Sequence, residues 1–316
     1  MYTKLLPRSL CLFFSILCFA NVKSECPPKE NISPCRCESP SDPTIVCSNI
    51  RKMETINDVF ENSHGIRFKY FILENSAIQF LPASSLISKR IRGLMIINTT
   101  LVGLFDQVPS SSNTVEMFML NNVVLQRAIQ WPMFQKLTKL IQIQLMNIAI
   151  KKLGKEFTGN INQGITSLLL SDNKMATLAD GVFVNLNELW NLHIIRNNIK
   201  TLKRSMFGRP ARIRNFDFMH NRIESLPDDL FTEMPHLKAV GLKGNRISIM
   251  KESVFVDVFS QLAVLNVAEN PIKCDCTIRW MTTRVHSQVL GTCVEPSARN
   301  GKKIKDLSEE EFNYCN

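Results

Sequence analysis

The chain has 316 residues, of which 45% are hydrophobic and 21% charged, and a formal charge of +10 from 38 Lys and Arg against 28 Asp and Glu. This composition is that of an ordinary globular protein and excludes a disordered or collagen-like chain, while the scarcity of Gly (12) and Pro (14) excludes a low-complexity architecture. The moderate basic excess permits an acidic partner but does not require one.

The first 24 residues are typical of a secretory signal peptide. Lys4 and Arg8 precede an apolar run from Leu10 to Ala20. Ser24 is a small residue suited to signal-peptide cleavage, with Ala20 as the alternative site. The run is too short to span a membrane, which takes about 20 residues. No other stretch reaches that length, and the C-terminus has no hydrophobic tail for a lipid anchor. We therefore expect a protein secreted to the extracellular space, with no membrane span or lipid anchor.

The chain has ten cysteines, of which Cys11 and Cys18 lie in the predicted signal peptide. The other eight form two groups of four, one toward each end of the chain. They are Cys26, Cys35, Cys37 and Cys47, then Cys274, Cys276, Cys293 and Cys315. An even count in a secreted chain indicates disulfides, although spacing alone leaves three connectivities per group. Zinc would also suit the C-x-C spacing, but no His lies near the first group and an oxidising compartment disfavours free thiolates.

Between these groups one apolar pattern recurs nine times. Blocks with apolar residues at positions 1, 4 and 6 begin at residues 68, 91, 115, 140, 165, 189, 213, 237 and 262, a period of 23 to 25 residues. A second series, Phe183, Phe207, Phe231 and Phe255, keeps the same period. Each block predicts a short strand whose residues 1, 4 and 6 point inward, while the Phe series fills the convex side of the core.

These blocks resemble the 24-residue leucine-rich repeats of extracellular proteins. The resemblance implies an α/β solenoid, a horseshoe of about nine repeats with a parallel concave sheet and a disulfide-bonded cap at each end. It implies the pairs Cys26–Cys37, Cys35–Cys47, Cys274–Cys293 and Cys276–Cys315. The expected organisation is a signal peptide at 1–24, an N-terminal cap at 25–64, repeats at 65–272 and a C-terminal cap at 273–316. The segment from Cys26 to Cys37 is in addition similar to the non-catalytic leucine-rich-repeat subunit of Oplophorus luciferin 2-monooxygenase and its arthropod relatives.

Position 9 of the blocks divides the chain into two halves. The last five blocks have Asn there, and its amide is expected to bond the backbone of neighbouring turns as a ladder. The first four have Ser76, Thr99, Val123 and Ile148, with Asn one place earlier at 75, 98, 122 and 147. The ladder should therefore break in the N-terminal half. Either water and backbone satisfy those turns, or the shifted Asn does so from another direction.

Because strand side chains alternate, positions 3, 5 and 7 of each block should face the concave side. In the first four blocks Ile72, Met95, Ile97, Met117, Met119 and Met146 would form an apolar stripe there. Such a patch usually marks an interaction site, and Met suits adaptable contact; alternatively, a second copy or an inserted loop covers it. We expect a protein partner to bind this face through Tyr70, Ile72, Met95, Ile97, Met117, Met119, Met146, Leu169, His193, Asp217 and Met219.

A run without acidic residues carries much of the basic excess. It contains Arg196, Lys200, Lys203, Arg204, Arg209, Arg212 and Arg214. Such a run is usually a solvated face. The sharper interpretation is a docking patch for a sulfated glycan or an acidic protein, acting through salt-sensitive attraction. A nucleic-acid partner is not expected, because no recognition module is present.

The sequence gives no indication of catalysis. The common hydrolase, metalloprotease, phosphate-loop and dinucleotide motifs are missing, and the five His are scattered over different repeats, with only His193, His220 and Asp217 expected near one another. We therefore expect no enzyme, metal or cofactor. Two sequons, at Asn98 and Asn31, are expected to accept glycans.

Two functions remain to be compared. The first is a secreted, non-enzymatic binding or scaffold protein, for example in the extracellular matrix, which engages a protein partner through its concave face. The alternative is a non-catalytic accessory subunit that stabilises or localises an extracellular enzyme, as the resemblance to the luciferase subunit would imply.

Overall fold

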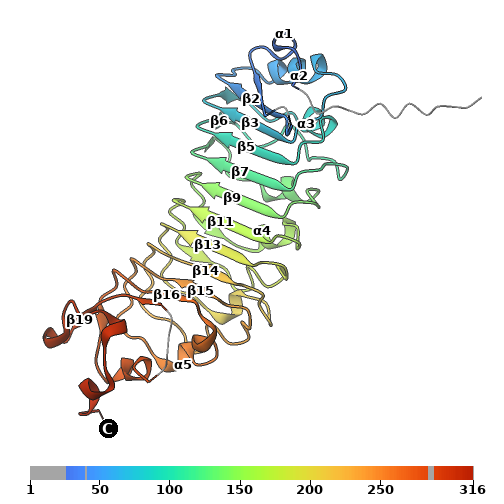
Figure 1. Ribbon diagram of the computed structural model, residues 1–316. Helices are drawn as coiled ribbons and strands as arrows, with labels where there is room; N and C mark the ends of the chain where they lie inside the picture. Colours follow the sequence, from blue (N-terminus) through green and yellow to red (C-terminus); the bar gives the residue numbers. More distant parts are fainter. Residues whose placement is uncertain (1–25, 40, 284–287, 316) are drawn as a thin grey trace, which may run out of the picture.

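Nine parallel strands begin at position 3 of the nine predicted blocks, and they stack side by side along the solenoid (Figure 1). The computed structural model describes residues 26–39, 41–283 and 288–315, so the predicted signal segment lies outside the described residues. The strands are β3 (Tyr70–Glu74), β5 (Gly93–Ile97), β7 (Met117–Asn121), β9 (Gln142–Met146), β11 (Ser167–Ser171), β13 (Asn191–Ile195), β14 (Asn215–Asp217), β15 (Ala239–Gly241) and β16 (Val264–Asn266). Equivalent positions pair throughout, as Tyr70 with Gly93 and Gly93 with Met117. The predicted parallel solenoid sheet is confirmed.

Both ends of the chain extend this sheet, which has twelve strands within the described residues. At the N-terminal end β2 (Thr44–Ser48) pairs in parallel with β3, and β1 (Arg36–Glu38) pairs antiparallel with β2. At the other end β18 (Val289–Leu290) pairs with β16. The sheet therefore runs past residues 65 and 272, and each cap covers the core partly by adding strands to it.

Short helices and small sheets form the rest of each turn. The α-helices are α1 (Lys29–Ile32), α2 (Met53–Asn62), α3 (Ala83–Ser88), α4 (Lys155–Asn160) and α5 (Glu252–Phe255). The 3-10 helices are η1 (Trp131–Phe134), η2 (Arg204–Met206), η3 (Phe259–Gln261), η4 (Cys276–Met281), η5 (Ser297–Arg299), η6 (Ile304–Asp306) and η7 (Glu309–Phe312). Small sheets pair β4 (Ala77–Ile78), β6 (Thr100–Leu101) and β8 (Val124–Leu125); β10 (Lys152–Leu153) and β12 (Thr177–Leu178); and β17 (Ile272–Lys273) and β19 (Cys293–Glu295).

The core follows the predicted positions. Side chains at positions 1, 4 and 6 are almost fully buried, as Phe68, Phe71 and Leu73 show with 1% exposure or less. The Phe series lies opposite them, and its rings contact along the core, with centroids 5.6 Å apart for Phe183 and Phe207. Each turn thus buries its apolar side chains against the next, because a single turn has no apolar interior of its own.

The amide ladder is present in the C-terminal half, as predicted. Asn221 is typical: its Nδ2 donates to the carbonyl oxygen of Ile194 at 2.7 Å, and its Oδ1 accepts from the backbone N–H of Ile199 at 3.0 Å. The equivalent residues Asn173, Asn197, Asn245 and Asn270 are buried and bonded in the same way. Each amide satisfies backbone groups that would otherwise be buried without a partner.

In the first two blocks hydroxyl groups replace the buried amide, and in the next two Val123 and Ile148 occupy its position. Ser76 Oγ accepts from the backbone N–H of Ile50 at 2.9 Å, and Thr99 Oγ1 accepts from the backbone N–H of Ser76 at 3.3 Å. The shifted Asn side chains bond one another on the surface instead, with Asn122 Nδ2 2.8 Å from Asn98 Oδ1. Asn75, Asn98, Asn122 and Asn147 all have positive φ, between 47° and 55°, a conformation that Asn tolerates better than most residues. The shifted Asn is therefore a turn residue and not a displaced ladder.

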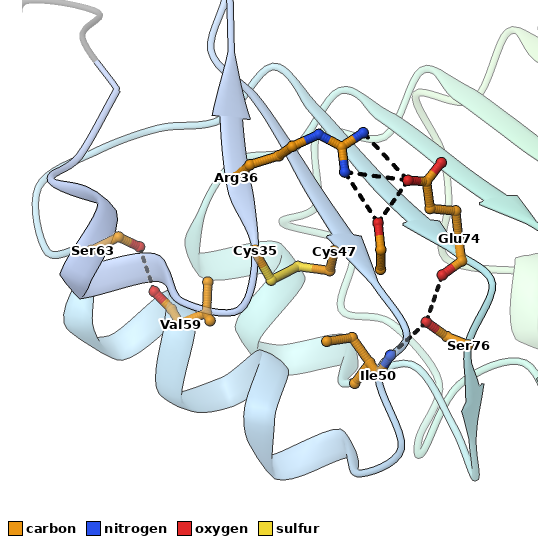
Figure 2. Close-up of a disulfide and its surroundings, with 9 residues drawn as sticks. Cys35, Arg36, Cys47, Ile50, Val59, Ser63, Glu74 and Ser76 are labelled. Carbon is orange, nitrogen blue, oxygen red and sulfur yellow. Dashed lines mark hydrogen bonds and ion pairs between the residues drawn. A yellow bond between two sulfur atoms is a disulfide. The ribbon is translucent and has the colours of Figure 1, made fainter.

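Four disulfides hold the two caps. They join Cys26 to Cys37, Cys35 to Cys47, Cys274 to Cys293 and Cys276 to Cys315, with Cα–Cα distances of 5.6, 4.2, 5.5 and 5.6 Å. These are the pairs that the family resemblance implies. Figure 2 shows the Cys35–Cys47 bridge, which ties the chain just before β1 to β2. The first strands of the sheet are thereby fixed to one another covalently.

Candidate functional site: the concave sheet face

The first four repeats present an apolar patch on the concave face. It consists of Ile72, Met95, Ile97, Met117, Met119 and Met146, and we call it the Met patch. All six side chains are half-buried, whereas their strand neighbours, such as Phe118 and Leu120, are fully buried in the core. The strand pairing places Ile72, Met95 and Met119 directly beside one another. At about 4.8 Å per strand the patch spans roughly 15 Å across β3, β5, β7 and β9.

Tyr70 forms one border of the Met patch by lying over Gly93. A Cβ atom at position 93 would come within 2.4 Å of the Tyr70 ring and 3.2 Å of Met117 Cε. Glycine at this position therefore leaves room for the Tyr70 ring and for Met117 of the Met patch. The pair was not recognised in the sequence, although Gly within a strand often marks such a close approach, and Gly93 is the first residue of β5.

The N-terminal cap forms another border of the Met patch, where Arg36 neutralises the charge of Glu74. Arg36 reaches from β1 to Glu74, with Nη1 and Nη2 each 3.3 Å from Glu74 Oε1 (Figure 2). Ser48 Oγ donates to the same oxygen at 2.6 Å. The Ser48 hydrogen bond, together with Arg36, lowers the pKa of Glu74, so this carboxylate stays ionised and bonded. Glu74 is at position 7 of its block, a position predicted to face the concave side, but the pattern gives no indication of its two partners.

Toward the C-terminus the concave face gains polar side chains. Leu169 lies beside His193, which lies beside Asp217 in the next strand, and the His193 Nδ1 to Asp217 Oδ2 distance is 3.5 Å. Asp217 Oδ1 also accepts from the backbone N–H of Met219 at 3.0 Å. All four side chains are half-buried at their predicted positions. The eleven predicted contact residues therefore share one face but divide into two halves. One is apolar, and the other mixes apolar side chains with His193 and Asp217; we call the second the polar half.

The basic run from Arg196 to Arg214 is not one patch. Arg196 directly follows β13, Arg204 lies in η2, and Arg214 directly precedes β14, so the run wraps around a whole turn. Arg204 was predicted to be a surface residue, and that prediction is wrong, because its side chain is 2% exposed. It donates to the carbonyl oxygens of Thr232 (2.7 Å), Phe207 (3.2 Å) and Gly208 (2.9 Å), and burial lowers its pKa.

Most of the remaining basic residues in the run have partners in adjacent repeats. The ion pairs are Arg196–Asp172 at 2.7 Å, Lys203–Asp180 at 3.2 Å, Arg209–Glu233 at 2.9 Å and Arg212–Glu188 at 3.0 Å. Arg214 lies over the Trp190 ring, 4.4 Å from its centroid. Lys200 is exposed. The acidic partners lie about one repeat away in sequence, so inspection of the run alone could not find them.

The two sequon residues lie on the surface. Asn98 is exposed, and its amide takes part in the surface row of Asn side chains. Asn31, at the other sequon, is exposed in α1. Within the described ranges, no three His, Cys, Asp or Glu side chains gather closely enough to hold a metal ion. No helix in the described part of the chain is both long and apolar enough to cross a membrane.

Comparisons with known proteins agree with this architecture. A leucine-rich-repeat family model matches residues 163–223. A chain in the structure titled as a complex of TLR13 with ssRNA13 has a TM-score of 0.64 at 20% identity, covering 72% of this chain and 32% of that one. A chain in the octameric complex of latrophilin 3, Unc5D and the leucine-rich-repeat part of FLRT2 has a TM-score of 0.59 at 16% identity, covering 87% and 97%. A search of curated proteins gives no match, so the likeness to the luciferase subunit gains no support.

The repeated apolar positions, the in-register sheet and the matched repeat family agree with one another. This chain is a leucine-rich-repeat solenoid closed at each end by a disulfide-bonded cap.

Proposed function

We propose that the chain is a secreted, non-enzymatic binding protein whose Met patch contacts an apolar surface of a protein partner. The observation that carries this proposal is the position of the Met patch. Six apolar side chains lie half-exposed and adjacent on a face whose other half mixes polar with apolar side chains. Apolar area left in water costs roughly 25 cal/mol per Å², so covering this face with a partner is favourable.

The two structural neighbours support binding as the general role of the fold. One was determined with ssRNA and the other in an assembly with two other proteins. A protein partner fits this chain better than a nucleic acid, because the Met patch is uncharged and the adjacent Glu74 is neutralised by Arg36. Met side chains also adapt to the shape of a partner more readily than branched ones.

An extracellular location fits the same proposal. Four disulfides, in two caps separated by a long stretch without cysteine, are typical of proteins that mature in an oxidising compartment. The proposed role is non-enzymatic because the side chains of the concave face are mainly apolar groups and amides. The glycans expected at Asn98 and Asn31 belong to this proposal as well.

The central experiment compares two double variants with equal added charge. Met117→Glu with Met119→Glu places two carboxylates in the Met patch, and Ala239→Glu with Val264→Glu places two at half-buried positions in the polar half of the same face. Each secreted protein is used to retain partners from extracellular fluid, followed by mass spectrometry. We expect a species held by the wild type and by the polar-half variant to be lost from the Met-patch variant, because the new carboxylates would have to be desolvated.

Two further measurements keep this experiment decisive. Leu120→Glu, in the same strand but pointing into the core with 0% exposure, should prevent folding and secretion, which separates loss of structure from loss of binding. Sedimentation of the wild type shows whether a second copy covers the Met patch. If the Met-patch variant is well folded and retains everything that the wild type retains, the concave face is not the binding surface.

A further inference from the structure

A second surface of the N-terminal half combines cavities with unpaired positive charge. It lies along the edge of the sheet where the strands begin. Three contiguous cavities, of about 710, 480 and 280 Å³, follow this edge from the side of α2 to Tyr70 and Met117. The first two share Arg67 and Arg90, and the last two share Lys69 and Arg92. We call the three together the basic trough.

Among the charged side chains that line the basic trough, cations outnumber carboxylates. Six are Lys or Arg, against three carboxylates: Arg67, Lys69, Lys89, Arg90, Arg92 and Lys139, with Asp42, Glu61 and Glu116. Lys69 pairs with Asp42 at 2.9 Å, and Arg92 with Glu116 at 2.8 Å. Lys89 is buried and donates to the carbonyl oxygen of Ser63 at 2.6 Å, so it is already committed to the fold.

Three cations remain without a partner among the described side chains. They are Arg67, Arg90 and Lys139, and all three are exposed. This differs from the same edge in the C-terminal half, where Arg212 pairs with Glu188 and Arg214 lies over Trp190. Unpaired cations gathered beside walls of low dielectric constant raise the local concentration of anions.

The spacing of these cations favours an elongated anion. Arg67 and Arg90 directly precede the first residues of blocks that start at 68 and 91, and Lys139 directly precedes the block at 140. They therefore stand in one column along the solenoid, with the first and last separated by three turns. At about 4.8 Å per turn the column extends for roughly 15 Å. A single small anion would contact only part of this column, whereas a chain with repeated anionic groups could contact all of it.

The residues that line the basic trough also favour a sulfated polymer over a single-stranded nucleic acid. Proteins that bind single-stranded nucleic acids combine positive charge with exposed aromatic rings on which bases stack. Phe60 and Phe68 line the basic trough but are buried to 2% exposure or less. The Tyr70 ring is half-buried and lies against Gly93, which leaves the imidazole of His64 as the one exposed ring among the described lining residues. Sulfate groups need only cations and hydrogen-bond donors, which the Arg side chains supply.

We propose that the basic trough binds a sulfated polysaccharide, with Arg67, Arg90 and Lys139 as its principal contacts. Lys69 and Arg92 line the same path and meet the anion while retaining their carboxylate partners. The site differs from the Met patch and does not depend on the proposed protein partner. It also differs from the basic run at 196–214, most of whose cations are already paired or buried.

The test uses a heparin-derived oligosaccharide as the probe and two triple variants of equal charge. Arg67→Gln, Arg90→Gln and Lys139→Gln remove the unpaired cations of the basic trough. Lys151→Gln, Lys174→Gln and Lys200→Gln remove three exposed cations that do not line it. In physiological salt we expect the trough variant to bind at least about tenfold more weakly than the wild type and the matched control to change less than about threefold. The loss should diminish as salt is added, because added ions screen these contacts.

Three competitor probes define the ligand class. The same oligosaccharide without its sulfates, a polyglutamate peptide and a single-stranded oligonucleotide should each bind at least about tenfold more weakly to the wild type. Equal losses in the two triple variants would show general charge attraction and overturn the proposal, and so would equal binding of the oligonucleotide. A circular dichroism spectrum and an unfolding midpoint like those of the wild type show that the trough variant is folded. Binding of the oligosaccharide by the Met117→Glu, Met119→Glu variant separates failure of this proposal from failure of the protein-binding one.

Discussion

The first four repeats and the last five share one architecture but use polar groups differently. In the last five, buried Asn amides bond the backbone of successive turns, while surface cations pair with acids of adjacent repeats. In the first four, the interior uses two hydroxyls and apolar side chains at position 9, while apolar residues and unpaired cations remain on the surface. The comparison shows that the buried Asn amides of the C-terminal half serve the fold, whereas the Met patch and the unpaired cations to which we assign binding lie in the N-terminal half.

The largest effect should come from Arg204, the buried cation of the C-terminal half. Arg204→Met replaces the aliphatic part of the Arg side chain with an unbranched apolar one. It leaves the carbonyl oxygens of Thr232, Phe207 and Gly208 without their donor. Buried acceptors that lose a partner cost about 1–3 kcal/mol each, so we expect the free energy of unfolding to fall by about 3 kcal/mol. Urea unfolding followed by circular dichroism measures the change.

Arg209→Met in the same run is the matched control for Arg204. Arg209 is exposed and pairs with Glu233 at 2.9 Å, and exposed ion pairs contribute about 0–1 kcal/mol. Similar losses in the two variants would mean that burial of Arg204 contributes nothing particular. The basic run would then again be a candidate surface patch.

A second pair of variants compares the two kinds of Asn. Asn221→Ala removes a buried amide, leaving the N–H of Ile199 and the carbonyl of Ile194 unsatisfied, and should cost about 2 kcal/mol. Asn122→Gly removes only an exposed side chain at a residue with φ of 55°, which Gly adopts freely, and should cost less than about 0.5 kcal/mol. Chemical denaturation of both variants checks the ratio. A larger loss at Asn122 would mean that the surface row also supports the fold.

The repeats were predictable from the sequence because burial imposes a period on it. Residues such as Phe68, Phe71 and Leu73 must be apolar in every turn, so the nine blocks fix both the strands and their register. The extension of the sheet into the caps was not predicted, because β2 lies outside the blocks and its pairing with β3 depends on tertiary contacts. The same limit applies to Arg36, whose contact with Glu74 spans 38 residues.

The error at the basic run has a related cause. In a solenoid with a 24-residue period, residues close in sequence lie around one turn, while residues one period apart lie side by side. A run such as Arg196 to Arg214 therefore cannot form a compact patch, and Arg204 within it faces the interior. Aligning the blocks by column would have shown Arg67 and Arg90 at equivalent positions. Their lack of acidic partners still required the structure.

The C-terminal cap offers a smaller, pH-dependent effect. Glu311 accepts from Lys302 Nζ at 2.6 Å and from the backbone N–H of Ser308 at 2.9 Å, and these bonds lower its pKa to about 2. Because the folded pKa lies below the unfolded value of about 4.3, the stabilisation is present above pH 4.3 and is lost as the pH falls toward 2.

Glu311→Gln tests this contribution without changing the shape of the side chain. Since Glu311 is partly exposed and screened by water, we expect the variant to be less stable by at most about 1 kcal/mol at pH 6. The difference from the wild type should shrink between pH 4.3 and pH 2. Denaturation at pH 6, 4 and 3 measures it, and a difference that stays constant with pH would show that the carboxylate charge is not involved.

The smallest effect on stability, but a clear one on mass, should come from Asn98 in the N-terminal half. A glycan on this exposed amide leaves the core unchanged, and one remaining N–H can still donate to Asn75. Glycosidase digestion of protein recovered from the culture medium of a eukaryotic host should lower its mass without changing the unfolding midpoint, and Asn98→Gln should remove most of the mass shift. Asn98 directly follows Ile97 of the Met patch, so a glycan there would border the proposed binding surface and leave the opposite edge, where the strands begin, open to a partner. An unchanged mass after digestion would contradict glycosylation at both sequons and would leave both edges of the Met patch accessible.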